Sequence, residues 1–348
     1  MNSTKIEEIE SFCVKLKVIY DTILIALIHV TSFCLNLMCI LVYAKLFRSN
    51  KIINKTNDLF KYLLVKSMVD TYLNFLLILE LFFAGAYTKN LGIDKIYGLG
   101  IFFLIFGIYF MFSLELVSIM IEVAATFNRF RKIKSKFKLF DRIPFECVIV
   151  GIFVYSFGFY SYKFASTNVS KIESKNETSY SIQKTDLDTS MGYMHSIVRD
   201  GLCVLAIIVF NIWTMYEMKN VLIRKRSLTN VSTRDNIEKR LTLMVICMSL
   251  ITIVGHGVIL IRYFSPRGSF LKENQCCLAF SETLFWFSYQ INFFLYYFFN
   301  LKFKKCFLRL SLSFLGKTGF KLNFKKDLQL DLESTRNENR INQIETIF

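Results

Sequence analysis

Proline and histidine are nearly absent from this sequence, which has 2 prolines and 3 histidines among 348 residues. Proline kinks or breaks helices, so a chain this poor in it has few built-in bending points. The three histidines (His29, His195 and His256) lie in separate apolar stretches. There is also no His-Glu-x-x-His motif, no P-loop and no nucleophile elbow. We therefore expect that the protein is not an enzyme.

Charge is also scarce, since only 20% of the residues are charged whereas 53% are hydrophobic. A mean hydropathy of +0.41 argues against a soluble protein. The 37 phenylalanines and 17 tyrosines exclude disorder, which requires little apolar surface. A net charge of +16 would suggest nucleic acid as a partner of a soluble protein, but in a membrane protein it reports on topology. We expect several membrane spans and no nucleic-acid partner.

Seven apolar stretches are long enough to cross about 30 Å of hydrocarbon, which takes about 20 residues of helix. All must be helices, because open strands would leave backbone groups unpaired in lipid. This predicts an all-α membrane protein, a seven-transmembrane helix bundle over residues 18–300. The predicted spans are 18–47, 59–84, 97–127, 143–162, 195–218, 241–264 and 276–299.

Lysine and arginine are unevenly divided between the two sides of this bundle. Of the 43 basic residues, 29 fall on the side of the carboxyl terminus and 12 on the side of the amino terminus. Basic residues are retained in the cytoplasm. Residues 1–17 are therefore predicted to be extracellular, and residues 316–348 to form a cytoplasmic tail. The expected location is the plasma membrane, with several passes.

Ionisable residues inside spans are costly and usually face the bundle interior. In the third span, Glu115, Ser118, Glu122 and Arg129 follow spacings of three, four and seven, which places them on one helix stripe. Asp70 lies about three turns into the second span. The alternative is that each such group is only a hydrogen-bond fastener between helices, worth about 1 kcal/mol or less.

Short motifs follow one another in successive spans. The first span contains Asn36 and leaves through Leu-Phe-Arg-Ser, and the second has Leu-Val-Lys-Ser-Met-Val before Asp70. The third ends Asn-Arg-Phe at 128–130, and the seventh closes Asn-Phe-Phe-Leu-Tyr at 292–296. In this order the chain resembles the rhodopsin-like (class A) G-protein-coupled receptors, in divergent form, over residues 20–307. The seventh span is most similar to that of invertebrate FMRFamide-like neuropeptide receptors.

The resemblance implies a receptor that passes an extracellular signal to a heterotrimeric G protein. It also implies a short amphipathic eighth helix at 301–315. Residues expected to act in activation and G-protein coupling are Asn128, Arg129, Phe130, Asn292 and Tyr296. Asn128 stands where the family has an acidic residue, so the resting state is expected to be weakened and basal activity raised.

The family's interior sodium site is matched by Asp70, Ser118 and Asn292, a set of hard oxygen ligands. A sodium ion is thus a candidate ligand, and no other cofactor is expected.

Ligands of such bundles enter from outside into the upper cavity between helices. Glu115 is the strongest candidate, because an interior carboxylate favours a cationic ligand group such as an amine or a peptide's arginine. The alternative is that Glu115 is protonated and bonds a neighbouring helix. The polar loop around residues 163–192 suits a lid over a peptide. The full candidate set by depth is Glu80, Tyr109, Phe112, Glu115, His256, Glu282, Trp286 and Tyr289.

Modification sites are predicted from short signals. Sequons at Asn2, Asn168 and Asn176 lie in predicted outside segments, and Cys306 on the eighth helix is a candidate for palmitoylation. Cys13 can pair with Cys276 or Cys277, or all three can be free thiols.

The chain departs from the family in lacking prolines in spans five, six and seven. His256 aligns with the proline of span six, between Gly255 and Gly257, which supply either local flexibility or close helix packing. Two further functions remain open. One is a chemosensory receptor for small molecules with the same architecture. The other is a transporter or channel, which the absence of an internal repeat and the odd number of spans disfavour.

Overall fold

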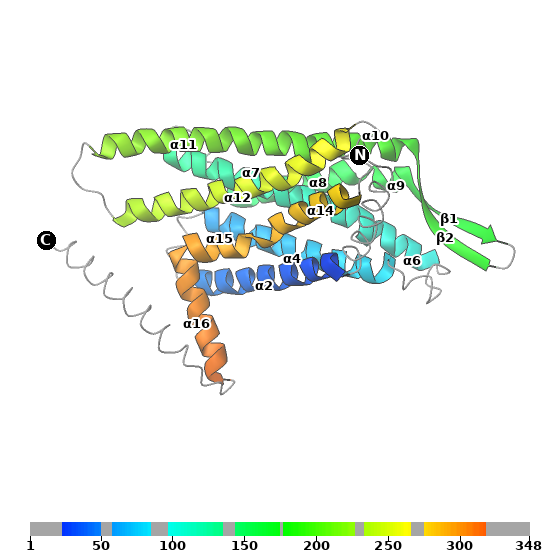
Figure 1. Ribbon diagram of the computed structural model, residues 1–348, viewed down its shortest axis with the longest axis horizontal. Helices are drawn as coiled ribbons and strands as arrows, with labels where there is room; N and C mark the ends of the chain where they lie inside the picture. The colour runs from blue at the N-terminus through cyan, green and yellow to red at the C-terminus, as the bar shows by residue number, and fades with distance from the viewer. Residues whose placement is uncertain are drawn as a thin grey trace, which may run out of the picture.

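The computed structural model describes residues 23–49, 58–84, 97–134, 143–174, 177–226, 233–265 and 275–317. In these segments the chain is almost entirely helical, with one two-stranded antiparallel sheet. Figure 1 shows the long helices side by side along the longest axis of the molecule. We call the two ends of this bundle the hairpin end, which carries the sheet, and the α16 end.

Six helical segments among the described residues are long and apolar enough to cross a membrane. They confirm an all-α membrane protein with several passes. Their bounds are Ile25–Arg48, Asp58–Leu81, Gly100–Lys134, Phe145–Ser166, Asp186–Val221 and Lys239–Phe264. The corresponding elements are α2 (Ile25–Ser49), α4 (Asp58–Ala84), α6 (Tyr97–Phe102) with η3 (Phe103–Phe110) and α7 (Met111–Lys134), α8 (Phe145–Tyr160) with α9 (Lys163–Ser166), α10 (Asp186–Ser196) with η5 (Ile197–Cys203) and α11 (Val204–Arg226), and α12 (Thr233–Phe264).

The seventh predicted span corresponds to two shorter helices. These are α14 (Gln275–Gln290), of 16 residues, and α15 (Asn292–Phe299), of 8 residues, with a turn at Ile291 between them. Neither helix alone is long enough to span a membrane. The backbone bond from Ile291 N to Phe287 O is 3.2 Å and that from Leu295 N to Ile291 O is 3.1 Å, so helical bonding continues through the turn.

The helices form a closed ring. Along it, α2 contacts α4, α4 contacts α7, α7 contacts α11, α11 contacts α12, α12 contacts α14, and α14 returns to α2. Helix α8 packs on α7. Buried apolar residues of these helices pack together in the core, but the centre of the ring also holds polar side chains such as Asn36, Asp70 and Asn292, all buried.

The outer surface has the opposite character. Val154 on α8, Ile261 on α12 and Phe298 on α15 are each more than half exposed. Charged residues at the centre and large apolar ones outside are what a bundle surrounded by lipid requires.

The polar loop predicted at 163–192 is ordered in the described part. Strands β1 (Thr167–Ser174) and β2 (Glu177–Lys184) form an antiparallel hairpin, and α9 and α10 flank it. The Nζ of Lys163 lies 2.6 Å from Asp188 Oδ1, which ties α9 to α10. The fifth helical segment thus begins at Asp186, earlier than predicted, since Asp186 and Asp188 favour a helix amino terminus.

Helix α16 (Leu301–Lys317) follows α15 and, as Figure 1 shows, runs transverse to the long helices, past the end of α2 and out beyond the bundle. The Asn300 Oδ1 accepts a hydrogen bond of 3.1 Å from Phe303 N, so Asn300 caps the helix. Phe303 and Cys306 are buried against the bundle, whereas Leu301 and Lys302 are exposed.

Candidate functional site

The first group of buried charges, which we call the Arg199 cluster, lies in the ring toward the hairpin end. It consists of Glu115 on α7, Arg199 and Asp200 on η5, His256 on α12 and Phe285 on α14. All five side chains are buried. Four separate elements therefore meet at one point inside the bundle.

Arg199 is the centre of this cluster. Its Nε and Nη2 donate to the two carboxylate oxygens of Asp200 at 2.8 and 3.0 Å, and its Nη1 donates to Glu115 Oε2. The guanidinium also lies 5.1 Å from the Phe285 ring centroid. His256 Nδ1 is 2.6 Å from Asp200 Oδ1. A two-pronged arginine–carboxylate pair of this kind is both strong and directional.

Two adjacent residues, Arg199 and Asp200, are both buried in the bundle, and both belong to the π-helix η5. The wider π turn changes the direction in which successive side chains leave the helix, and such turns are frequent at functional sites. With His256 neutral, the cluster has two carboxylates and one guanidinium, a formal charge of −1. Glu115, which is predicted to bind a cationic ligand group, is therefore already paired with a cation of the protein itself.

The other predicted ligand residues divide into three groups. Tyr289 lies near the cluster, and Trp286 makes an edge contact of 4.8 Å with Phe285. Tyr109 instead donates to the carbonyl of Phe157 at 3.1 Å, so it faces α8. Of the remaining members, Phe112 stacks on Tyr160, Glu80 is partly exposed and interacts electrostatically with Glu115, and Glu282 is partly buried on α14.

A second group, which we call the Lys66 cluster, lies deeper toward the α16 end. It consists of Lys66 and Asp70 on α4, Ser118 and Glu122 on α7, and Asn292 on α15, all buried. Lys66 Nζ donates to Ser118 Oγ at 2.8 Å and lies 3.5 Å from Asp70 and 3.4 Å from Glu122. Ser118 donates to Asp70 at 2.5 Å, and the Asn292 amide lies 3.5 Å from the other oxygen of Asp70.

The structure thus brings together the three residues predicted to hold sodium, Asp70, Ser118 and Asn292. The structure also places a positively charged side chain in the same site, because the ammonium of Lys66 lies among these oxygens. A sodium ion would have to share that position with a positive charge. Sodium binding stays a prediction, and the position of Lys66 argues against it.

A small polar cavity separates the two clusters. Tyr289 lies between them, its ring 5.5 Å from Lys66 Nζ, and its buried hydroxyl has no hydrogen-bond partner among the described residues. The residues that line the cavity are Lys66, Ser118, Ile119, Glu122, Thr252, His256, Ser288 and Tyr289. A member of each cluster, His256 and Lys66, therefore borders the same space.

The predicted coupling residues lie at the α16 end. Arg129 is buried and its Nη2 donates to Thr242 on α12 at 2.8 Å. Asn128 does not bond Arg129 in the way a carboxylate would; its Oδ1 accepts from Arg131 at 3.1 Å. Phe130 stacks on Trp213 with centroids 5.4 Å apart, and Tyr296 packs edge-on against Tyr43 at 5.5 Å.

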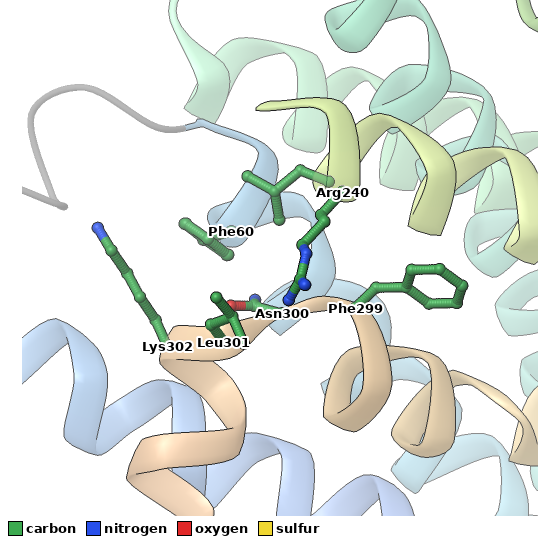
Figure 2. A pocket seen from close by; sticks show the side chains of 7 residues that line it. Phe60, Arg240, Phe299, Asn300, Leu301 and Lys302 are labelled. Carbon is green, nitrogen blue, oxygen red and sulfur yellow. The ribbon is translucent and has the colours of Figure 1, made fainter. Parts of the chain in front are cut away.

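A pocket opens where α4, α12, α15 and α16 meet. Figure 2 shows the Arg240 side chain reaching toward Asn300 across it, with Phe60 on the opposite wall. The lining combines basic and apolar residues: Phe60, Arg240, Leu241, Phe299, Asn300, Leu301 and Lys302.

The predicted modification sites differ in their exposure and in whether they belong to the described residues. Asn168 is exposed on β1, whereas Asn2 and Asn176 lie outside the described residues. Cys306 is only 7% exposed, and its Sγ lies 3.6 Å from the carbonyl oxygen of Val42. This burial raises the pKa of the Cys306 thiol, which disfavours the reactive thiolate. Palmitoylation stays a prediction that requires α16 to move away from α2.

The cysteine alternatives are partly resolved. Cys276 is disulfide-bonded, whereas Cys277 forms no disulfide. The other described cysteines also form none. The predicted partner, Cys13, lies outside the described residues.

Sequence reasoning missed Lys66, Arg199 and Asp200 as site residues. Lys66 stands four residues before Asp70, a spacing that places both on one helix face, and this signal was available. Arg199 and Asp200 are charged residues at the start of an apolar stretch, which marks them as interior candidates. That both face inward, and that they lie on a π-helix, has no clear signal in the sequence. In comparisons with known proteins, no family model and no curated protein matches the chain.

Proposed function

We propose that the protein is a G-protein-coupled receptor that passes the binding of an extracellular ligand to a heterotrimeric G protein. One observation carries the proposal: buried polar groups extend along the axis of an otherwise apolar bundle. They begin at the Arg199 cluster, border a shared cavity with the Lys66 cluster, and continue along α7 to Arg129. A soluble fold would not place such a series inside apolar helices, and a purely structural bundle would not need it.

The proposal includes seven spans and an eighth helix. Residues 275–299, in α14 and α15, are together long enough to cross the hydrocarbon, and Phe287, Phe294 and Phe298 on them are exposed as lipid-facing residues would be. The amphipathic α16 would then lie along the membrane surface. The charge bias argues for an extracellular amino terminus and a cytoplasmic carboxyl terminus in the plasma membrane.

The ligand site would be the region around the Arg199 cluster at the hairpin end. Its formal negative charge, with Glu80 nearby, favours a ligand that has a cationic group, such as a neuropeptide. Such a group would compete with Arg199 for Glu115. Helix rearrangement would follow, because Glu115, Arg199 and His256 come from three different elements of the ring.

The transducer would dock at the α16 end. The pocket of Figure 2 joins apolar side chains to Arg240 and Lys302, a combination that suits an amphipathic helix with a terminal carboxylate. Arg129 lies at the same end, bonded to Thr242 on α12. Movement of α12 would break that bond and expose Arg129 to the partner.

The test is expression with promiscuous G proteins and a screen of peptide and amine libraries. Ligand-dependent G-protein activation is expected, and Arg129→Ala should abolish it without loss of surface expression. Asn128→Asp should lower ligand-free signalling, because a carboxylate holds Arg129 more firmly than an amide.

A chemosensory receptor of the same architecture would respond to small molecules and not to peptides in that screen. A transporter or channel would instead give ion flux with no G-protein activation. The latter result, with Arg129→Ala unchanged from wild type, would contradict the receptor proposal.

A further inference from the structure

Lys66 is a full positive charge held at the centre of the bundle. It is 4% exposed, and Asp70 beside it is not exposed at all. Burying an ammonium is costly unless oxygens surround it. Here Ser118 lies at 2.8 Å, Glu122 at 3.4 Å and Asp70 at 3.5 Å from Nζ.

The ammonium is supplied by the same helix as one of its carboxylates. Lys66 and Asp70 are four residues apart on α4, so their side chains lie on one face, and both reach across to α7. Because the cation is covalently attached, its presence does not depend on ions in solution. On the fourth side, the Tyr289 ring lies 5.5 Å from Nζ.

We propose that Lys66 is a tethered cation that occupies the interior site in place of a free sodium ion, so that the protein is indifferent to sodium. The oxygens of Asp70, Ser118 and Glu122 surround the ammonium as they would a small cation. A second cation at this place would be repelled by Lys66 at close range in a medium of low dielectric.

Removal of the ammonium should convert the cluster into a genuine cation site. Without the ammonium, the carboxylates of Asp70 and Glu122 would have no positive charge beside them. Together with the nearby hydroxyl and amide, they would offer a set of hard oxygen ligands. One Glu122 oxygen, Oε1, already has no hydrogen-bond partner among the described residues. Sodium from solution would then stabilise the variant, although it does nothing for the wild type.

The test measures thermal unfolding of the purified full chain in sodium chloride, and in N-methylglucamine chloride at equal ionic strength. The wild type and Lys66→Arg, which keeps the charge, should unfold at the same temperature in both salts. Lys66→Met should gain about 2 °C or more in sodium. The double variant Lys66→Met with Asp70→Asn should lose that gain.

Two results would overturn the proposal. One is a sodium-specific stabilisation of the wild type that Asp70→Asn abolishes, and this measurement decides the matter even where Lys66→Met does not fold. The other is a folded Lys66→Met variant that is equally stable in both salts. No ligand or G protein enters the experiment, so its outcome is independent of the proposed receptor function.

Discussion

At the scale of single residues, the unusual feature is how many formal charges are buried and how many of them lie beside an opposite charge. Arg199 donates three hydrogen bonds to Asp200 and Glu115, and Lys66 lies between Asp70 and Glu122. Each cation has more carboxylate around it than it can neutralise. Removal of a cation should therefore cost far more than removal of one of its anions.

Arg199→Gln should destabilise the fold by about 3–5 kcal/mol, because it leaves the buried carboxylates of Glu115 and Asp200 without the guanidinium that balances their charge. Addition of Glu115→Gln should recover part of that loss. The measurement is thermal unfolding of the wild type and the two variants in detergent. Equal stability of Arg199→Gln and the wild type would show that the pair is not desolvated as the structure describes.

At the scale of elements, α12 shows how a helix without proline is fitted to its neighbour. Gly255 faces α14, and a Cβ on it would lie 3.2 Å from the carbonyl oxygen of Leu284 and 3.3 Å from the Cα of Phe285. Gly257, two residues on, has no atom within 4 Å of the same position. Of the two readings of the Gly-His-Gly sequence, close packing therefore applies at Gly255.

Gly255→Ala should destabilise the bundle by about 1–3 kcal/mol, because backbone atoms of α14 would have to shift. Gly257→Ala is the matched control. It should be neutral or stabilising by roughly 0.5–1 kcal/mol, since alanine is the better helix former. Thermal unfolding of both variants checks this, and equal effects at the two positions would contradict the packing role of Gly255.

At the scale of the whole molecule, polarity is inverted relative to a soluble protein. Buried positions hold Asp70, Glu115 and Arg199, whereas large apolar residues such as Val154 and Phe298 face outward. The two ends also differ: the hairpin end carries the β1–β2 sheet, and the α16 end carries the pocket with Arg240. The proposed orientation places the hairpin outside.

Glycosylation tests this orientation. Asn168 is exposed on β1, so Asn168→Gln should remove one glycan and increase gel mobility by a single step. Treatment with a glycosidase should bring both proteins to the same mobility. Sequons at Asn54 and Asn230, on the basic side, should stay unmodified. A glycan on either of them would show that the topology is the reverse of the one proposed.

The sequence alone determined the class of the protein and its side-to-side charge bias, because span length and basic loops are local properties of the chain. It also determined the polar stripe of Glu115, Ser118 and Glu122, since helical periodicity acts within one element. These residues are buried as the stripe predicts.

Only the tertiary structure decided what the stripe meets. Lys66 reaches Ser118 from another helix, and Arg199 reaches Glu115 from 84 positions along the chain. Which residues of distant helices meet depends on crossing geometry and on local departures such as the π-helix η5, and neither is encoded in periodicity. The same physics placed a lysine where the sequence had suggested a sodium ion.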